Sequence, residues 1–358
     1  MKKRFLQVIS TLIVTASCAL GQQPATVNDT ARLLAGLPVE GPLAPLTQSP
    51  AWQEYARAID NAWGRKEHRQ LQRIRAWMHE NAGPYFHSTA TMYYMFSGPD
   101  FVYAQTFFPD ANTYILAGLE PVGQVPELTR WSPEQLAPDL AALRVSMSSI
   151  LRFQYFITKE MRADLVRENI GGTLPILYVF LARTGCTVLD VTRVSSPAEG
   201  VKITFRNFAH KQPQTLFYFK TDLSGGGSAF LKWCAARGPG VSLLKAASYL
   251  MHGEGFGGVR NFLLQNSRVI VQDDSGIPLR AFPKNWRVQG FGRYVPHGDE
   301  FLKYNQPELA AMCVDNTDLG FAFGYHWQQK RGLLMLATPD GGGPARMPPV
   351  TKAMPVPQ

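Results

Sequence analysis

Residues 91–123 constrain the fold of this chain more than any other stretch, because they read as strand, turn, short helix and strand. Residues 92–96 and 113–119 are uninterrupted apolar and aromatic runs, which are typical of strands buried on both faces of a parallel sheet. Gly98 and Pro99 end the first run, and the link to the second is near the dozen or so residues that a parallel crossover needs. The stretch therefore predicts a compact βαβ unit, with a long hairpin as the alternative.

The remaining pattern predicts a mixed α/β fold, with a partly parallel sheet and helices packed on it. Apolar residues recur at helical spacing on both sides of Gly64, which predicts an N-terminal helical hairpin over 50–81. Three segments between 187 and 221 read as an antiparallel meander. We also expect a helix over 242–251 and a strand over 319–327.

The chain divides into four parts by composition. Residues 1–21 read as a signal peptide, since Lys2, Lys3 and Arg4 precede an apolar run that is too short for a membrane span. Residues 22–48 hold a short helix and a Pro-rich linker, 49–338 form a single α/β domain, and 339–358 are a Pro/Gly-rich tail expected to be disordered. Export to the periplasm or the medium follows, with no transmembrane span.

A second reading of the N-terminus uses Cys18, which follows Thr15-Ala16-Ser17. This run resembles a bacterial lipoprotein box, in which the cysteine is acylated and becomes the first mature residue. A lipid anchor at Cys18 is therefore the alternative to a freely exported protein.

Charge and cysteine usage exclude several classes of function. The net charge of +9 is spread along the chain without a basic stripe, so we expect no nucleic acid as a partner. Cys186, Cys234 and Cys313 form no CxxC pair, which argues against a redox motif. An odd number leaves at least one thiol free, and one disulfide is permitted. Cys234, beside Trp233, is expected to be buried and reduced.

Acidic residues stand where the predicted strands end. Asp100 and Glu120 follow the first two strands, and ligands of open α/β sheets lie beyond the carboxyl ends of strands. Glu120 also has the spacing of a ribose-binding acid, but the loop offers only Gly98, and Pro99 removes a backbone donor that a phosphate would need. The alternative is that Asp100 caps a helix and Glu120 is solvated.

The second acidic site is Asp273-Asp274-Ser275-Gly276, directly after a strand of strong β character. Adjacent carboxylates bind divalent cations, or one acts as a base, although neighbours in an extended chain point to opposite faces. The alternative is an Asp-rich turn that bonds its own backbone.

We expect Asp100, Glu120 and Asp273 to converge on one pocket, with Lys245 or His252 supplying positive charge. Such a site binds a metal or a polyhydroxy or cationic ligand. The alternative is three separate carboxylates, each bonded to its own turn.

Two short motifs bear on catalysis. Ser242-Leu243-Leu244-Lys245 matches the S-x-x-K pattern of penicillin-binding proteins, but no K-T-G follows. His252-Gly253-Glu254-Gly255 partly matches an esterase oxyanion loop, but the chain has no G-x-S-x-G elbow, which excludes the α/β-hydrolase fold.

The runs MFSGPDF…FFPDANTYILAGLEPVG and KAASYLMH…VIVQDDSGIP, with FGRY and FGYHW after them, resemble segments of uncharacterised exported bacterial proteins over most of the mature chain. The resemblance implies a shared fold and carries over no catalytic residues. Two functions stay open: an exported hydrolase with a carboxylate-lined pocket for a small polar or polyhydroxy ligand, or a non-catalytic ligand-binding or envelope-associated protein. The sequence leaves the cofactor and any metal unidentified.

Overall fold

The structure is a computed structural model that describes residues 25–153, 169–210, 212–226, 228–314, 317–326 and 332–340. The predicted signal peptide, Cys18 and the tail from residue 341 onward lie outside these ranges. Within them, every helix is too short or too polar to cross a membrane.

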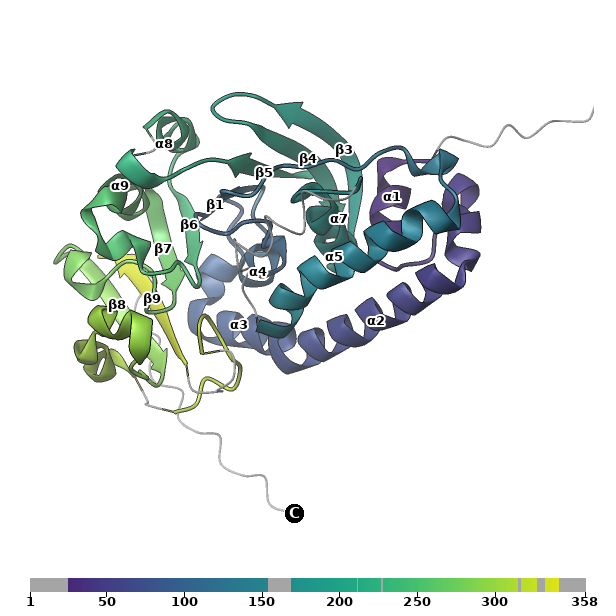
Figure 1. Cartoon of the computed structure of the whole chain (residues 1–358). Coiled ribbons are helices and arrows are strands. Elements are labelled where there is room, and N and C mark those ends of the chain that lie inside the picture. The colour runs from purple at the N-terminus through teal and green to yellow at the C-terminus, as the bar shows by residue number, and fades with distance from the viewer. Residues whose placement is uncertain are drawn as a thin grey trace, which may run out of the picture.

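One mixed sheet runs through the described part of the chain, with strand order β3-β4-β5-β2-β1-β6-β7-β9-β8 (Figure 1). The five central strands, β5-β2-β1-β6-β7, are parallel, and antiparallel strands extend both edges. The predicted mixed α/β class is therefore confirmed. The strands are β1 (Thr91–Tyr94), β2 (Thr113–Gly118), β3 (Cys186–Val194), β4 (Gly200–Asn207), β5 (Gln214–Lys220), β6 (Gly240–Leu244), β7 (Ser267–Gln272), β8 (Trp286–Gly292) and β9 (Leu333–Pro339).

The central βαβ unit forms as the sequence predicts. Helix α4 (Phe101–Phe107) joins β1 to β2, and the two strands pair in parallel with Met92 opposite Tyr114. This pairing excludes the hairpin alternative. Helix α4 has seven residues, which fits the short crossover. Six of them are buried, so the helix has almost no solvent-exposed face.

Helices cover both faces of the sheet, which explains the uninterrupted apolar strands. Met92 and Tyr94 pack into a core shared with the helices of one face, and Tyr93 and Met95 pack into a second core under α8 and α9. This alternation is the period of two that a strand imposes on its side chains. The helices besides α4 are α1 (Val27–Leu34), α2 (Pro50–Lys66), α3 (Gln72–Phe86), α5 (Pro133–Phe153), α7 (Leu174–Arg183), α8 (Ser228–Ala235) and α9 (Gly257–Asn266).

The N-terminal helices are present, but their connection differs from the predicted hairpin. Helical backbone continues through Gly64 and a π-helical segment, Glu67–Leu71, into α3, so α2 and α3 form one long bent element (Figure 1). The segment expected to be a linker forms a 3-10 helix, Gly41–Gln48, with Leu43 and Leu46 buried. The apolar side chains of this proline-rich segment pack against α1 and α2, so the segment is part of the folded core rather than a linker.

Two predicted elements are wrong. Residues 242–251 do not form a helix: the chain continues as β6 to Leu244 and then turns into a 3-10 segment, Leu250–His252. All five residues of β6 are buried, and a short apolar run of this kind fits a buried strand as well as a helix. The described part of 319–327 consists of turns, because Gly320 and Gly324 adopt positive φ angles that interrupt an extended chain.

Candidate functional site

The carboxyl ends of four parallel strands carry the predicted site residues. Asp100 and Glu120 follow β1 and β2 within six residues, Lys245 follows β6 directly, and Asp273 and Asp274 follow β7 directly. The chain leaves β1 towards β2 on one side, while β6 pairs with β1 on the other. Such a reversal of strand order is where open α/β sheets bind ligands.

The backbone at this edge is strained. Phe96, Ala246, Ser248 and Tyr249 are non-glycine residues with φ between 50° and 60°. Each such conformation costs on the order of 1–3 kcal/mol and persists where surrounding contacts over-determine it, which is common at functional sites. Three of the four lie in the loop after β6, so this loop is held in one specific shape.

Asp100 and Lys245 form a buried ion pair. Lys245 Nζ lies 2.7 Å from Asp100 Oδ2, with side chains 1% and 3% exposed. Tyr94 donates its hydroxyl to the same oxygen at 2.8 Å, and Asp100 Oδ1 is buried without a partner. Burial lowers the pKa of Lys245 and raises the pKa of Asp100, and each charge partly offsets the shift of the other. The pair joins the ends of two adjacent strands.

A second lysine lies beside this pair. The Lys245 ammonium is 3.6 Å from the centre of the Tyr103 ring, and Lys66 Nζ donates to the Tyr103 hydroxyl at 2.6 Å. That hydroxyl donates in turn to Gln70 Oε1 at 2.6 Å. Burial, and then the like charge of Lys245, lowers the pKa of Lys66 well below its usual value. Sequence reasoning missed Lys66, since it stands among other cations on a helix where a solvated side chain is the ordinary expectation.

Asp273 is bonded within its own turn and also faces Lys245. Its Oδ1 accepts from the backbone N–H of Ser275 at 3.0 Å, and its Oδ2 accepts from Ala246 N–H at 2.8 Å. Burial and the neighbouring Asp274 carboxylate raise the pKa of Asp273 to about 6. Its charge also acts on Lys245. Asp273 thus fits both expectations: an Asp-rich turn and a place beside the ion pair.

Glu120 is buried rather than solvated. Its side chain packs against Gly98, where an added Cβ would stand 3.4 Å from Oε2, and its backbone carbonyl accepts from the Tyr218 hydroxyl at 2.8 Å. The carboxylates whose negative charge raises the pKa of Lys245 are those of Asp100 and Asp273. The structure therefore brings two of the three predicted carboxylates together around one lysine and places Glu120 against the β1 loop.

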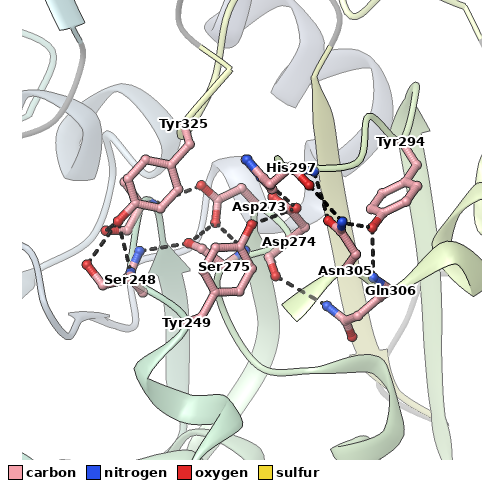
Figure 2. A network of polar contacts seen from close by, with 12 residues as sticks. Ser248, Tyr249, Asp273, Asp274, Ser275, Tyr294, His297, Asn305, Gln306 and Tyr325 are labelled. Atoms are coloured by element: carbon pink, nitrogen blue, oxygen red, sulfur yellow. Dashed lines mark hydrogen bonds and ion pairs between the residues drawn. The ribbon is translucent and has the colours of Figure 1, made fainter. Parts of the chain in front are cut away.

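Asp274 points away from its neighbour towards a different set of residues (Figure 2). Its Oδ2 accepts from the Tyr249 hydroxyl at 2.9 Å and lies 3.1 Å from His297 Nε2, while its Oδ1 is buried without a partner. His326 stacks on His297, with ring centres 4.5 Å apart. Sequence reasoning missed His297, which lies in a loop far along the chain with no motif around it. His326 falls in the segment 319–327, which was expected to be a strand with His326 as a packed or edge side chain.

A pocket opens beside Tyr249, with a volume of about 470 Å³. We call it the Tyr249–Tyr304 pocket; it is lined by Ser248, Tyr249, Leu250, His252, Gly253, Gly255, Phe256, Arg280, Lys303, Tyr304 and Asn305. Of the six predicted site residues, His252 is the one in this lining. The four predicted carboxylates are not part of this lining.

His252 is the chemically distinctive residue of this pocket. Its ring hydrogen-bonds the backbone carbonyl of Asp274, and burial, with the charge of Arg280, lowers its pKa to about 4. The imidazole is therefore neutral at pH 7. Its Nε2 is buried without a partner, and a neutral ring that donates through one nitrogen has an acceptor at the other.

The serine–lysine motif does not form a catalytic pair. Ser242 Oγ lies 2.7 Å from Ser267 Oγ within the sheet, whereas Lys245 bonds Asp100. Because these residues lie in and just after a strand, no helical turn sets them on one face.

Comparison with known proteins gives no further guide: no family model, curated protein or solved structure matches the chain. The functional argument therefore rests on the geometry of the site.

Proposed function

We propose that this chain is an exported enzyme, a hydrolase acting on a small anionic substrate held in the Tyr249–Tyr304 pocket. The observation that carries the proposal is the neutral His252, with its unpartnered Nε2, in a pocket bordered by the cations Arg280 and Lys303. Export is inferred from the N-terminal pattern of residues 1–21. Mass spectrometry of the mature protein tests it: the expected N-terminus is Gln22, and an acylated Cys18 would identify a lipoprotein instead.

The lining matches the chemistry of such a substrate. Arg280 and Lys303 attract a carboxylate, sulfate or phosphate group. The half-buried ring of Tyr304, which stacks on the buried ring of Tyr249, offers apolar surface to a sugar or aromatic moiety. A buried acceptor without a donor costs about 1–3 kcal/mol, so a substrate hydroxyl or a water molecule that donates to His252 Nε2 regains that energy. A small ligand with both anionic and hydroxyl groups therefore fits best.

In the proposed reaction, His252 Nε2 takes a proton from water, and the oxygen attacks the electrophilic carbon or phosphorus of the substrate. A base must be unprotonated at working pH, and a pKa of about 4 keeps His252 in that form; the same low pKa makes it a weaker base than a histidine with a pKa near 7. Arg280 and Lys303 stabilise the negative charge that develops on the substrate oxygens. His252 then returns its proton to the leaving group.

The test separates binding from turnover. Thermal shifts with carboxylates, sugar phosphates and nucleotides are measured first, followed by hydrolysis of nitrophenyl esters. The double variant Arg280→Gln/Lys303→Gln should lose ligand-induced stabilisation, while Lys284→Gln/Arg287→Gln, two exposed cations outside the pocket lining, should keep it. His252→Gln should bind ligand and lose turnover. Equal binding by both double variants would refute the pocket assignment.

The second candidate is non-catalytic binding of the same ligand. It is favoured by the burial of Lys245, Asp100 and Asp273, which are each at most 3% exposed and are therefore shielded from a substrate in the pocket. Stabilisation by a ligand, without turnover of any ester by the wild-type protein, would select this function.

A further inference from the structure

Asp274, His297 and His326 are drawn together from three separate parts of the chain. Asp274 follows β7, His297 lies in the loop after β8, and His326 lies in the turns before β9. Each offers one ligand atom, and the three atoms all lie within 4.8 Å of one another.

A free acceptor in the cluster points to a missing ligand. Asp274 is 3% exposed, and its Oδ1 has no hydrogen-bond partner. A carboxylate oxygen buried in this way costs free energy unless a cation or donor meets it. Asp273, one residue earlier, differs in this respect, since both of its oxygens accept hydrogen bonds from the surrounding turn.

We propose that Asp274, His297 and His326 bind a divalent transition-metal ion of the class of Zn²⁺. Two imidazoles and one carboxylate are a ligand set that zinc and iron(II) sites use. Metal–ligand bonds of about 2.1 Å in a tetrahedron place the ligand atoms about 3.4 Å apart. The ligand atoms lie within 4.8 Å of one another, so binding of an ion would draw them closer by up to about 1.4 Å.

Neighbouring residues already fix the orientation of two of these ligands. Tyr249 donates its hydroxyl to Asp274 Oδ2, and Gln306 donates its side-chain amide to the Asp274 carbonyl at 3.3 Å. The side chain of Asn305 accepts from the His297 N–H and donates to the His297 carbonyl, both at 2.8 Å (Figure 2). Outer contacts of this kind position metal ligands and strengthen binding.

Three protein ligands leave a fourth position open on a tetrahedral ion, which distinguishes catalytic from structural zinc sites. Tyr249, which bonds Asp274, also lines the Tyr249–Tyr304 pocket. The ion would therefore lie one side chain away from the pocket. The metal site does not rest on the proposed hydrolase, since its ligands and its free acceptor stand without any substrate.

The experiment uses untagged mature protein, because a polyhistidine tag would bind metal itself. Metal content is measured by plasma mass spectrometry before and after chelation. Binding of Zn²⁺ to the stripped protein is measured by calorimetry, and Co²⁺ reports coordination through its visible absorption. We expect one ion per chain, a four-coordinate Co²⁺ spectrum and a rise in melting temperature on adding Zn²⁺.

Variants assign the ligands. His297→Ala and His326→Ala should each weaken Zn²⁺ binding by more than about 100-fold, because even outer partners of metal ligands cost about 10- to 100-fold when removed. The matched control is His210→Ala: His210 also pairs with an aspartate, Asp110, at 2.9 Å, but the other oxygen of Asp110 is occupied by His87. This control should bind Zn²⁺ like the wild type.

Loss of folding is separated from loss of the metal by melting each variant with chelator present. In that condition the variants should unfold near the metal-free wild type, and only the stabilisation by Zn²⁺ should disappear. Zn²⁺ binding that survives both His297→Ala and His326→Ala, or absence of binding by the wild type, would overturn the site. Neither result bears on the ligand screen of the Arg280 and Lys303 variants, so the two proposals fail separately.

Discussion

Replacing Lys245 by methionine removes the cation from the buried ion pair and keeps most of the side-chain volume. Lys245 Nζ and Asp100 Oδ2 are 2.7 Å apart. At an effective dielectric constant of about 20, Coulomb's law gives a gross attraction of roughly 6 kcal/mol for such a pair. Desolvation offsets much of this attraction in the native protein, but removing one partner leaves the other charge buried, which costs about 3–5 kcal/mol.

The exposed pair Lys220–Glu199 provides the matched control. Its charged atoms are 3.7 Å apart, and its side chains are 46% and 59% exposed. In water the same calculation gives roughly 1 kcal/mol before side-chain entropy is counted, and exposed pairs contribute about 0–1 kcal/mol. Lys220→Met should therefore change stability several-fold less than Lys245→Met.

The double variant Asp100→Leu/Lys245→Met completes the test. With both charges gone, no unpaired ion remains, and apolar replacements of buried pairs are often neutral or stabilising. The double variant should therefore be more stable than either single variant. Urea denaturation followed by far-UV circular dichroism gives the free energies, with midpoints compared at a common slope. If Lys245→Met costs no more than Lys220→Met, or if the single effects simply add, the ion-pair reasoning is wrong.

Three further predictions concern single side chains. Gly324→Ala should destabilise the protein by more than Gly320→Ala in urea denaturation, because both glycines have positive φ but only at Gly324 would a Cβ overlap the Asp273 carboxylate; equal losses would contradict this. Cys234 should resist thiol reagents at pH 8 in the native protein and react in urea, since burial raises its pKa to about 12; rapid native labelling, read by peptide mass spectrometry, would refute it. Burial also raises the pKa of Tyr93 to about 12. An unfolded tyrosine ionises near pH 10, so the stability that Tyr93 contributes is complete below pH 10 and is lost as pH rises towards 12. Tyr93→Phe should reduce the alkaline loss measured in urea.

The sequence predicted the positions of the strand-end residues because that information is local. Asp100 and Asp273 each follow an apolar run that ends at a turn, and parallel strands place their carboxyl ends on one edge. Their meeting around Lys245 follows from the strand order, which puts β1 beside β6. That adjacency joins segments about 150 residues apart, and no local pattern encodes it.

Other errors have physical causes that the sequence shows only weakly. Residues 242–244 are apolar enough for either a strand or a helix, and only pairing of β6 with β1 and β7 decides between them. Glu120 reads as a solvated acid, but glycine at positions 98 and 118 leaves room for its carboxylate against the backbone. Those two glycines, at the ends of neighbouring strands, were the available signal for close packing.

The two halves of the candidate site differ in how freely they can respond to a ligand. Asp273 and Asp274 are adjacent, so their side chains leave the strand end in opposite directions. Asp273 faces Lys245 in a buried network in which Lys245 bonds Asp100 Oδ2 while Asp100 Oδ1 has no partner, and the ion pair suits a rigid support for the ends of β1 and β6. Asp274 faces Tyr249 and His297 and keeps a free oxygen, and His252, bonded to its carbonyl, keeps a free nitrogen. Two buried acceptors without donors, Asp274 Oδ1 and His252 Nε2, are therefore carried by a backbone that the Lys245 ion pair supports. We expect this arrangement where a ligand or an ion supplies the missing partner.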